Sequence, residues 1–316
     1  MNRILVIRGG AIGDFILTLP GLKALRDANP KAHIEILGYQ HIAALAENRF
    51  YAQAVRSIEY GPFSSFFAED AQLSAELGNY FASFDLIITY LYDPDEVFET
   101  NLLRCGVKQI LRGPAKIVSG SHAAHQLARP LLLLGIEVND LAAKVFPSAE
   151  NCHAAKVFLL DLPHPIVAFH PGSGSEIKNW PIENWIEIGN HLLKSRGFGG
   201  SIIIVSGEAD ETRVRQLESI WGNSRVRFAR NLPLPHLAAV FEHTTFVGHD
   251  SGISHLAAAV GAKCILLFGP TDPAVWAPLN ENVQVVRAPN GHLAEVDPAA
   301  VRAALAQALM RIGIRT

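Results

Sequence analysis

Short apolar runs alternate with longer amphipathic stretches along the whole chain. This alternation is typical of a parallel sheet covered by helices, because strands buried on both faces read as nearly continuous apolar runs. The apolar runs predict strands at residues 4–8, 33–37, 54–58, 86–90, 109–111, 166–170, 202–206, 245–248 and 264–268. The amphipathic stretches predict helices at residues 14–28, 41–47, 122–134, 182–195, 210–221, 234–242 and 254–260.

The strand–helix pattern occurs twice, and Pro163 and Pro165 separate the two occurrences. A chain of 316 residues is long enough for two domains, since single cores tend to split near roughly 250–300 residues. We therefore predict an α/β protein of two Rossmann-like domains, residues 1–155 and 156–316, whose parallel sheets face a central cleft. A last helical stretch, residues 298–312, packs on the second domain or crosses back to the first.

The composition, with 49% hydrophobic and 18% charged residues, is that of a globular protein with a large core. The net charge of -3 argues against a nucleic-acid-binding protein, for which a basic balance is expected. Cys105, Cys152 and Cys264 form no CxxC pair and are typical of free thiols in a reducing compartment. No apolar run is long enough to span a membrane or to form a signal peptide. We expect a cytoplasmic protein and leave peripheral contact with the inner membrane open.

The clearest candidate site is the segment of residues 248–255. A predicted strand ends just before Asp250, Ser251 and Gly252, and a helix of small residues follows with His255 in its first turn. The start of a helix exposes unpaired backbone N–H groups and a partial positive charge, and glycine lets a bulky anion come close. These features predict a phosphate site. The alternative is an ordinary helix capped by Asp250 or Ser251.

The loop of residues 171–181 follows another predicted strand and offers further anion ligands. It combines a Gly-Ser-Gly-Ser run, which includes Ser173, with Lys178, whose point charge suits a diphosphate. Taken alone it is an ordinary loop, but together with residues 248–255 it predicts a clamp for a diphosphate. After the next strand, Glu208 or Glu211 either accepts hydrogen bonds from ribose hydroxyls or is a solvated acid at a helix start.

A glycine-rich segment follows the first predicted strand, but it lacks the dinucleotide fingerprint. Gly9, Gly10 and Gly13 do not have the GxGxxG spacing, and no acidic residue ends the second strand, so a nicotinamide site is disfavoured. Asp14 lies at the start of the first helix beside these glycines, with Arg8 at the strand end. We interpret Asp14 as a general base for an acceptor hydroxyl. The alternative is a helix-terminal charge that favours the helix dipole.

Residues 100–136 contain no Asp or Glu but several basic side chains, among them Arg112 and Lys116. This stretch is suited to an anionic acceptor or an anionic membrane surface, or is an unevenly charged surface without a ligand. Asp93 and Asp95 form an Asp-x-Asp pattern, which binds metal in one class of glycosyltransferases. The intervening proline favours a turn that leads into a helix, and we predict no metal site.

Four motifs in the same order resemble those of the ADP-heptose:lipopolysaccharide heptosyltransferases, glycosyltransferase family 9. They are GDFILTLP (13–20) with LKALR (22–26), HPG (170–172) with KNWP (178–181), GHDSG (248–252) with HLAAA (255–259), and FGPTDP (268–273) with WAP (276–278). The resemblance covers essentially the whole chain.

The resemblance implies a GT-B fold in which the first domain binds the acceptor and the second binds the nucleotide sugar. It implies inverting, metal-independent transfer from an ADP-linked heptose to a lipopolysaccharide-core acceptor, without a cofactor. Asp14 is then the base, and Lys178 stabilises the leaving diphosphate. The donor-binding residues it implies are Ser173, Lys178, Glu208 or Glu211, Asp250, Ser251, Gly252 and His255. The acceptor-side residues are Arg8, Gly9, Gly10, Gly13, Arg112 and Lys116.

Several alternatives stay open at this point. His249 and Ile253 lie inside the nucleotide motif where other members carry different residues, and the Arg8 segment lies where the family varies most. The donor base, the sugar and the acceptor, an anionic glycolipid or another glycan, are therefore expectations. A transferase with another nucleotide sugar, an epimerase or hydrolase, and a nucleotide-binding module without transfer activity are the alternatives. A nicotinamide-dependent oxidoreductase is compatible with the fold alone.

Overall fold

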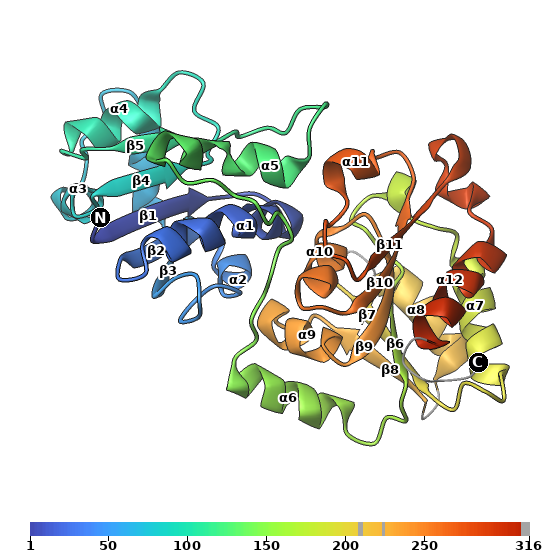
Figure 1. Cartoon of the computed structure of the whole chain (residues 1–316). Helices are drawn as coiled ribbons and strands as arrows, with labels where there is room; N and C mark the ends of the chain where they lie inside the picture. The colour runs from blue at the N-terminus through green and yellow to red at the C-terminus, as the bar shows by residue number, and fades with distance from the viewer. Residues whose placement is uncertain (208–210, 223–224, 311–316) are drawn as a thin grey trace. The chain divides into compact units, whose positions relative to one another are not determined.

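The computed structural model describes residues 1–207, 211–222 and 225–310, and it divides into two compact units (Figure 1). The units are Met1–Leu141 and Ala142–Thr316, and each contains a parallel sheet with helices on both faces. This confirms the predicted α/β fold class with two Rossmann-like units. The predicted boundary at 155–156 falls inside α6 (Ala149–Leu159), which packs against α9 (Leu234–Phe241) in the second unit, so the structure places the division earlier.

The first unit is built on a five-stranded parallel sheet in the order β3-β2-β1-β4-β5. Its strands are β1 (Arg3–Arg8), β2 (His33–Gly38), β3 (Ala54–Ser57), β4 (Leu86–Thr89) and β5 (Ile110–Arg112). Its helices are α1 (Ile12–Ala28), α2 (Gln40–Ala43), α3 (Ala75–Ala82), α4 (Val97–Arg104) and α5 (Ala123–Ala128), with 3-10 helices η1 (Gly61–Phe67) and η2 (Arg129–Leu134).

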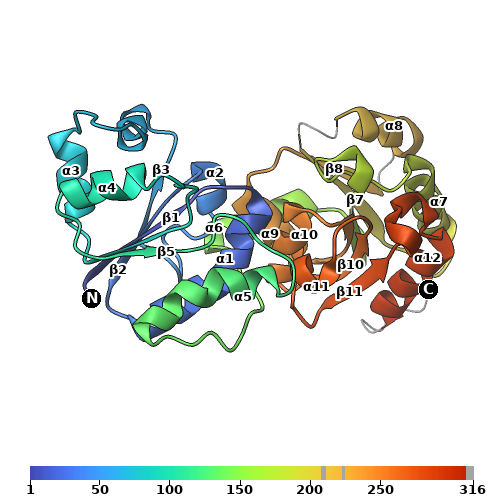
Figure 2. The same cartoon turned by 90° about the horizontal axis from the view of Figure 1, so that it is seen from above.

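Successive side chains of a strand point to opposite faces of the sheet, so β1 contributes to two separate cores. Different helices cover the two faces. Leu5 and Ile7 of β1 belong to an aromatic-rich core that η1, α3 and α4 close, with Phe66, Phe81 and Phe98 at its centre. The helices α1 and α5 pack against each other on the opposite face of the sheet (Figure 2). Side chains on both faces of β1 are buried, which explains why residues 4–7 form an uninterrupted apolar run.

The second unit is built on a six-stranded parallel sheet in the order β11-β10-β9-β6-β7-β8. Its strands are β6 (Ile166–His170), β7 (Ser201–Ser206), β8 (Val226–Arg230), β9 (Thr244–His249), β10 (Lys263–Phe268) and β11 (Val283–Arg287). Its helices, besides α6 and α9, are α7 (Ile182–Lys194), α8 (Glu211–Trp221), α10 (Gly252–Ala259), α11 (Pro273–Trp276) and α12 (Pro298–Met310). The 3-10 turns are η3 (Glu176–Lys178), η5 (Pro289–Gly291) and η6 (Leu293–Glu295).

The last helix, α12, packs on the second unit. Its apolar side chains Val301, Leu305 and Leu309 join one core with Trp185 of α7 and Trp221 of α8. The described part of this helix therefore packs on the second unit, the first of the two possibilities predicted from the sequence. In the part of the chain that the structure describes, no helix combines the length and the apolar character needed to cross a membrane.

Both sheets contain a point where the strand order reverses. It lies between β1 and β4 in the first unit and between β6 and β9 in the second. Loops after two such strands turn away in opposite directions and leave a crevice at the carboxyl ends, where ligands of open α/β sheets bind. Asp14 follows β1, Ser173 and Lys178 follow β6, and Asp250 and Ser251 follow β9, whereas Arg112 ends β5 and Glu211 follows β7.

Candidate functional site

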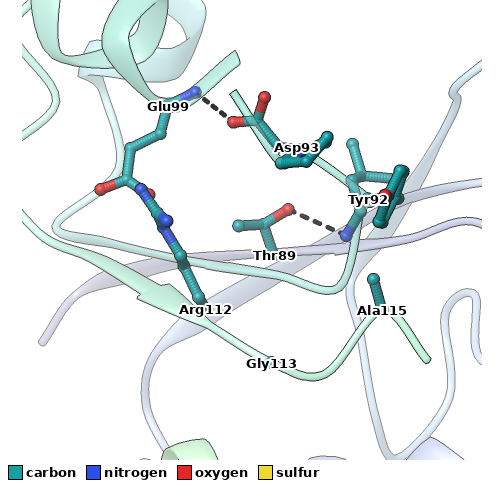
Figure 3. A pocket seen from close by; sticks show the side chains of 9 residues that line it. Thr89, Tyr92, Asp93, Glu99, Arg112, Gly113 and Ala115 are labelled. Atoms are coloured by element: carbon teal, nitrogen blue, oxygen red, sulfur yellow. Dashed lines mark hydrogen bonds and ion pairs between the residues drawn. The ribbon is translucent and has the colours of Figure 1, made fainter. Parts of the chain in front are cut away.

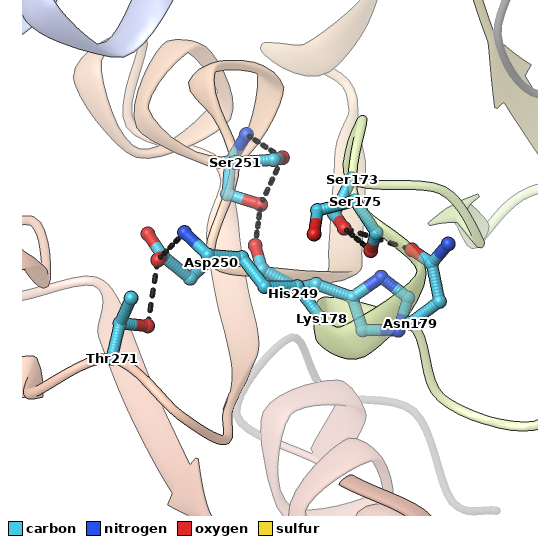
Figure 4. A network of polar contacts seen from close by, with 9 residues as sticks. Ser173, Ser175, Lys178, Asn179, His249, Asp250, Ser251 and Thr271 are labelled. Carbon is cyan, nitrogen blue, oxygen red and sulfur yellow. Dashed lines mark hydrogen bonds and ion pairs between the residues drawn. The ribbon is translucent and has the colours of Figure 1, made fainter.

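In the second unit, the loops after β6, β9 and β10 meet in one polar cluster (Figure 4). The Lys178 ammonium lies 2.7 Å from Asp250 Oδ2. The same oxygen accepts a hydrogen bond of 2.7 Å from the Thr271 hydroxyl. The Asp250 side chain is 10% exposed and that of Lys178 28%, so the lysine is the more accessible partner. An anion bound in this cluster would interact with the Lys178 ammonium, which Asp250 already holds in position.

Ser251 caps the start of α10, which begins at Gly252. Its hydroxyl accepts a hydrogen bond from the Ser254 N–H at 3.3 Å and lies 3.4 Å from His170 Nδ1 at the end of β6. His255 is 5% exposed in the first turns of α10. The structure therefore contains the helix capped by Ser251 that the sequence predicted as one alternative. The first N–H groups of this helix lie at the carboxyl edge of the sheet, near Lys178.

The loop between β6 and α7 is fixed by its own polar contacts. The Ser173 hydroxyl lies 2.8 Å from Asn179 Oδ1 and 3.0 Å from the Ser175 carbonyl oxygen. His249, fully buried at the end of β9, accepts the Trp180 N–H at Nε2 over 2.9 Å, and its Nδ1 lies 3.5 Å from the Gly172 carbonyl oxygen. Because a backbone N–H can only donate, Nδ1 carries the ring proton and His249 binds both ends of the loop.

In the first unit, Asp14 stands in the first turn of α1, at the carboxyl end of β1. Its Oδ2 accepts the Ala11 N–H at 3.0 Å, and its Oδ1 lies 3.6 Å from Arg8 Nη2. The Asp14 side chain is 34% exposed, whereas Arg8 is buried and donates from Nε to the Thr18 hydroxyl at 3.1 Å. Burial lowers the pKa of the Arg8 guanidinium, and the Asp14 carboxylate opposes that shift. The carboxylate is oriented and partly open to solvent, as a base requires.

Glycine is required at residue 10 of this loop. Gly10 has φ +99°, a left-handed conformation that other residues rarely adopt, and a Cβ there would lie 2.9 Å from Asp14 Oδ2. Gly9 precedes it in the same loop, and Gly13 lies within the first turn of α1. The glycines therefore let the chain turn tightly around the Asp14 carboxylate.

The remaining predicted residues have other partners or are not described. Glu208 lies outside the described residues. Glu211 is exposed at the start of α8 and pairs with Arg215 at 2.5 Å. Arg112 forms ion pairs with Glu96 at 2.8 Å and with Glu99, and these carboxylates raise its pKa. Lys116 lies over the Tyr92 ring, 4.8 Å from its centroid.

Sequence reasoning did not assign site roles to Thr271, His170 or His249. Thr271 and His170 lie inside motifs that carry the family resemblance, and their position in these motifs could have marked them as candidate site residues. A buried histidine that holds a loop has no local sequence signature. Among residues 1–207, 211–222 and 225–310, no group of three or more His, Cys, Asp or Glu side chains is arranged to hold a metal ion.

Two Rossmann-like units, each built on a parallel sheet, are the architecture of the GT-B fold. Residues 122–302 match the model of glycosyltransferase family 9 (heptosyltransferase). This match covers more than half of the chain, and the chain belongs to this family. The family assignment that the sequence motifs suggested is confirmed.

Relatives of known name agree with this assignment. The chain is 26% identical to lipopolysaccharide heptosyltransferase 1 of Escherichia coli O18:K1:H7 (strain RS218 / NMEC), over 95% of this chain and 96% of that protein. It is 25% identical to lipopolysaccharide heptosyltransferase 3 of Escherichia coli K12, over 86% and 83% of the two chains. The match to lipopolysaccharide heptosyltransferase 2 of Escherichia coli K12, 23% identical, covers 54% of this chain and about half of that relative, 47%.

Solved structures share the fold. Escherichia coli ADP-heptose lps heptosyltransferase II superposes with a TM-score of 0.80 at 18% identity, over 99% of this chain and all of the other. Escherichia coli heptosyltransferase WaaC with ADP superposes with a TM-score of 0.72 at 21% identity, over 97% and 99% of the two chains. At these identities the likeness shows the fold, and it supports the GT-B class.

Proposed function

We propose that the chain transfers a heptose or related sugar from an ADP-sugar to a hydroxyl of a lipopolysaccharide-core type glycan, with inversion and without a metal or other cofactor. The observation that carries this proposal is the cluster of Lys178, Asp250 and the capped start of α10 at the carboxyl edge of β6 and β9. A lysine ammonium and a helix N-terminus together suit the two negatively charged phosphates of a nucleoside diphosphate. The choice of adenine and of heptose in this proposal is supported by the relatives' names, which mention heptosyl transfer and ADP.

The reaction follows from these groups. Asp14 takes the proton of the acceptor hydroxyl, and the resulting oxygen nucleophile attacks the anomeric carbon from the face opposite the diphosphate. The bond between the anomeric carbon and the diphosphate oxygen breaks as the new glycosidic bond forms. Lys178 and the N–H groups at the start of α10 stabilise the negative charge that develops on the leaving diphosphate. Asp250 and Thr271 keep Lys178 oriented for this role.

The proposal predicts that Asp14→Asn abolishes transfer but leaves donor binding nearly unchanged. Asparagine keeps an oxygen that accepts the Ala11 N–H, so the loop retains its hydrogen bond. It cannot accept the proton, and the loss of general-base catalysis typically costs about 10²–10⁴ in rate. Transfer is followed as ADP release in the presence of a heptose-terminated acceptor, and ADP affinity is measured by calorimetry without added metal.

The wild-type protein in the same calorimetric series, titrated with ADP, GDP, UDP, CDP and NAD, separates the alternatives. Selective ADP binding supports an ADP-sugar donor. A preference for UDP or GDP keeps the transferase but removes the ADP-heptose assignment, and binding of NAD alone contradicts the proposal. Loss of ADP binding in a normally folded Asp14→Asn protein would remove Asp14 from the role of base.

Cytoplasmic location and peripheral membrane contact stay predictions.

A further inference from the structure

His170 is a buried histidine that the proposed reaction does not use. It ends β6, is 4% exposed, and pairs in register with Gly248 of β9. Its Nδ1 lies 3.4 Å from the hydroxyl oxygen of Ser251, the residue that caps α10. Buried polar groups are held by hydrogen bonds, because a buried donor or acceptor without a partner costs free energy. The contact therefore links His170 to the start of α10, where the diphosphate is proposed to bind.

The proton positions in this contact follow from the neighbouring hydroxyls. The Ser254 hydroxyl donates its only proton to the His249 carbonyl oxygen, because a carbonyl can only accept. The Ser251 and Ser254 hydroxyl oxygens lie 3.2 Å apart, so Ser251 is the donor in this second contact. Since the Ser251 proton is then used, the contact with His170 requires the ring to donate. His170 therefore carries a proton on Nδ1.

Two donors fix the Ser251 hydroxyl oxygen. It accepts the Ser254 N–H at 3.3 Å and the Nδ1–H of His170, whose nitrogen is 3.4 Å away. Hydrogen bonds that a hydroxyl accepts polarise its O–H bond and make it a better donor. An ionised phosphate oxygen can only accept, so it would replace the Ser254 oxygen as the acceptor of the Ser251 proton. The hydroxyl is therefore preorganised to donate to an anion.

The other tautomer of His170 would have the opposite effect. A bare Nδ1 would accept the Ser251 proton and compete with a phosphate for it. With Nδ1 protonated, the Lys178 ammonium, the Ser251 hydroxyl and the first N–H groups of α10 are all donors toward an anion. The tautomer of His170 therefore decides whether Ser251 assists anion binding.

We propose that His170 is a positioning residue of the donor site, whose Nδ1–H holds the Ser251 hydroxyl as a hydrogen-bond donor to the diphosphate of the nucleotide sugar. It acts through Ser251 and needs no contact with the substrate. That the anion is a nucleoside diphosphate rests on the proposed function, whereas the tautomer rests on the hydrogen bonds of the second unit.

Two amide substitutions separate the two ring nitrogens of His170. In His170→Asn the amide nitrogen is bonded to Cγ, as Nδ1 is, and can donate to Ser251. In His170→Gln the amide lies one bond further from the backbone, near the place of Nε2, and the donor to Ser251 is lost. We expect His170→Gln to weaken ADP binding about tenfold, equivalent to about 1.4 kcal/mol, and His170→Asn to retain most of the affinity. Calorimetry of the whole chain without added metal measures both affinities.

Ser251→Ala tests whether His170 acts through Ser251. This variant should also weaken ADP binding, and His170→Gln added to it should cause little further loss, because residues that act through one contact are not additive. A role of His170 in the core alone would instead give the full loss in both backgrounds.

Thr89→Ala is the control for the loss of a hydroxyl. The Thr89 hydroxyl also accepts a backbone N–H at the end of a strand, that of Leu91 at 3.3 Å, but it lies at the wall of a pocket in the first unit (Figure 3). Its removal should leave ADP affinity unchanged. An equal loss of affinity in Thr89→Ala and Ser251→Ala would contradict a specific role of the Ser251 hydroxyl.

The proton on Nδ1 can also be observed in the wild-type protein. Long-range proton–nitrogen NMR spectra distinguish the two tautomers, and comparison with His170→Asn assigns the His170 signals. A bare Nδ1, equal ADP affinities of His170→Asn and His170→Gln, or a full further loss in the double variant would overturn the inference.

Titration of the wild-type protein separates this inference from the proposed function. If the wild type bound UDP or GDP instead of ADP, the ADP donor would be contradicted, and the same variants would test His170 with that nucleotide. If both the wild type and His170→Gln bound ADP equally tightly, the role of His170 would be contradicted and the proposed function would stand.

Discussion

Single residues here serve the local fold and the proposed chemistry at once. Asp14 accepts the Ala11 N–H at the start of α1 and is also the proposed base. Asp250 accepts hydrogen bonds from Lys178 and Thr271 and is also part of the proposed donor site. Structural and functional interpretations of such residues are therefore not alternatives. A substitution separates them only when it retains the hydrogen bond and removes the chemistry, or the reverse.

His249 allows this separation on the donor side. In His249→Phe an aromatic ring is kept, but the buried Trp180 backbone N–H loses its acceptor, which typically costs about 1–3 kcal/mol of unfolding free energy. The loop that carries Ser173 and Lys178 is then no longer held at both ends. We expect ADP affinity to fall about tenfold, as a loss of about 1.4 kcal/mol implies. Urea unfolding and ADP calorimetry measure the two effects.

His249→Gln is the control, because its amide oxygen offers an acceptor from the same strand position. It should retain more of the ADP affinity than His249→Phe. If the Phe variant bound ADP as tightly as wild type despite lower stability, the loop would be held by other contacts, and His249 would be a purely structural core residue.

At the scale of elements, the sequence predicted the interior strands of both sheets and the edge strands β3 and β5 of the first sheet, but not the edge strands β8 and β11 of the second. The strands β1, β6 and β10 are almost fully buried, so all their positions except the terminal ones are apolar and the run is easily recognised. The strands β8 and β11 lie at the two edges of the second sheet and contain exposed Arg230, Gln284 and Arg287. Their polar positions interrupt the apolar run, because an edge strand faces solvent, and neither was predicted.

One side chain links the beginnings of two neighbouring strands and makes stability depend on pH. Asp85, just before β4, accepts the N–H groups of Asn2 and Arg3 at 2.6 and 3.1 Å, and these hydrogen bonds lower its pKa. Its stabilising effect is fully present above the unfolded-chain pKa of about 3.9. It is lost as the pH falls from there through the lower folded-state pKa.

We therefore expect Asp85→Asn to lower the free energy of unfolding at neutral pH and to have little effect near the acid limit. The loss is small, because this side chain is exposed and solvent screens it. Urea titrations of both proteins from about pH 7 down to about pH 2 measure the difference, because the loss begins near the unfolded-chain pKa of about 3.9 and continues below it. Asp70→Asn, at another exposed carboxylate of the same unit, is the control, and a pH-independent difference for Asp85→Asn would contradict the assignment.

At the scale of the whole molecule, the described residues of the proposed donor site belong to one unit although they are far apart in sequence. Lys178 and Asp250 were both predicted as donor ligands, but their direct ion pair could not be, because it depends on β6 and β9 being neighbours. The ion pairs of Glu96 and Glu99 with Arg112 could likewise not be predicted from any local sequence pattern. Residue types and motifs can be recognised locally, whereas their pairing is a property of the assembled sheet.

Because Lys178, Asp250 and Thr271 of the proposed donor site all lie within the second unit, a fragment of residues 142–316 should fold and bind ADP by itself. The unit has its own core, formed by the β-sheet with α7, α8 and α12, and the loops of Lys178, Asp250 and Thr271 all belong to it. We expect its ADP affinity, measured by calorimetry, to be within a few fold of that of the full chain. A folded fragment that fails to bind ADP would show that the first unit contributes to donor binding.

The position of the boundary can be tested with the same fragment. A fragment of residues 156–316, cut where the sequence placed the boundary, loses the first part of α6, including the buried Ala155. Because α6 packs on α9, the shorter fragment should be less stable than residues 142–316 by at least about 2 kcal/mol, in the range for emptying a buried apolar site. Equal unfolding free energies of the two fragments in urea would show that α6 is dispensable and would favour the later boundary.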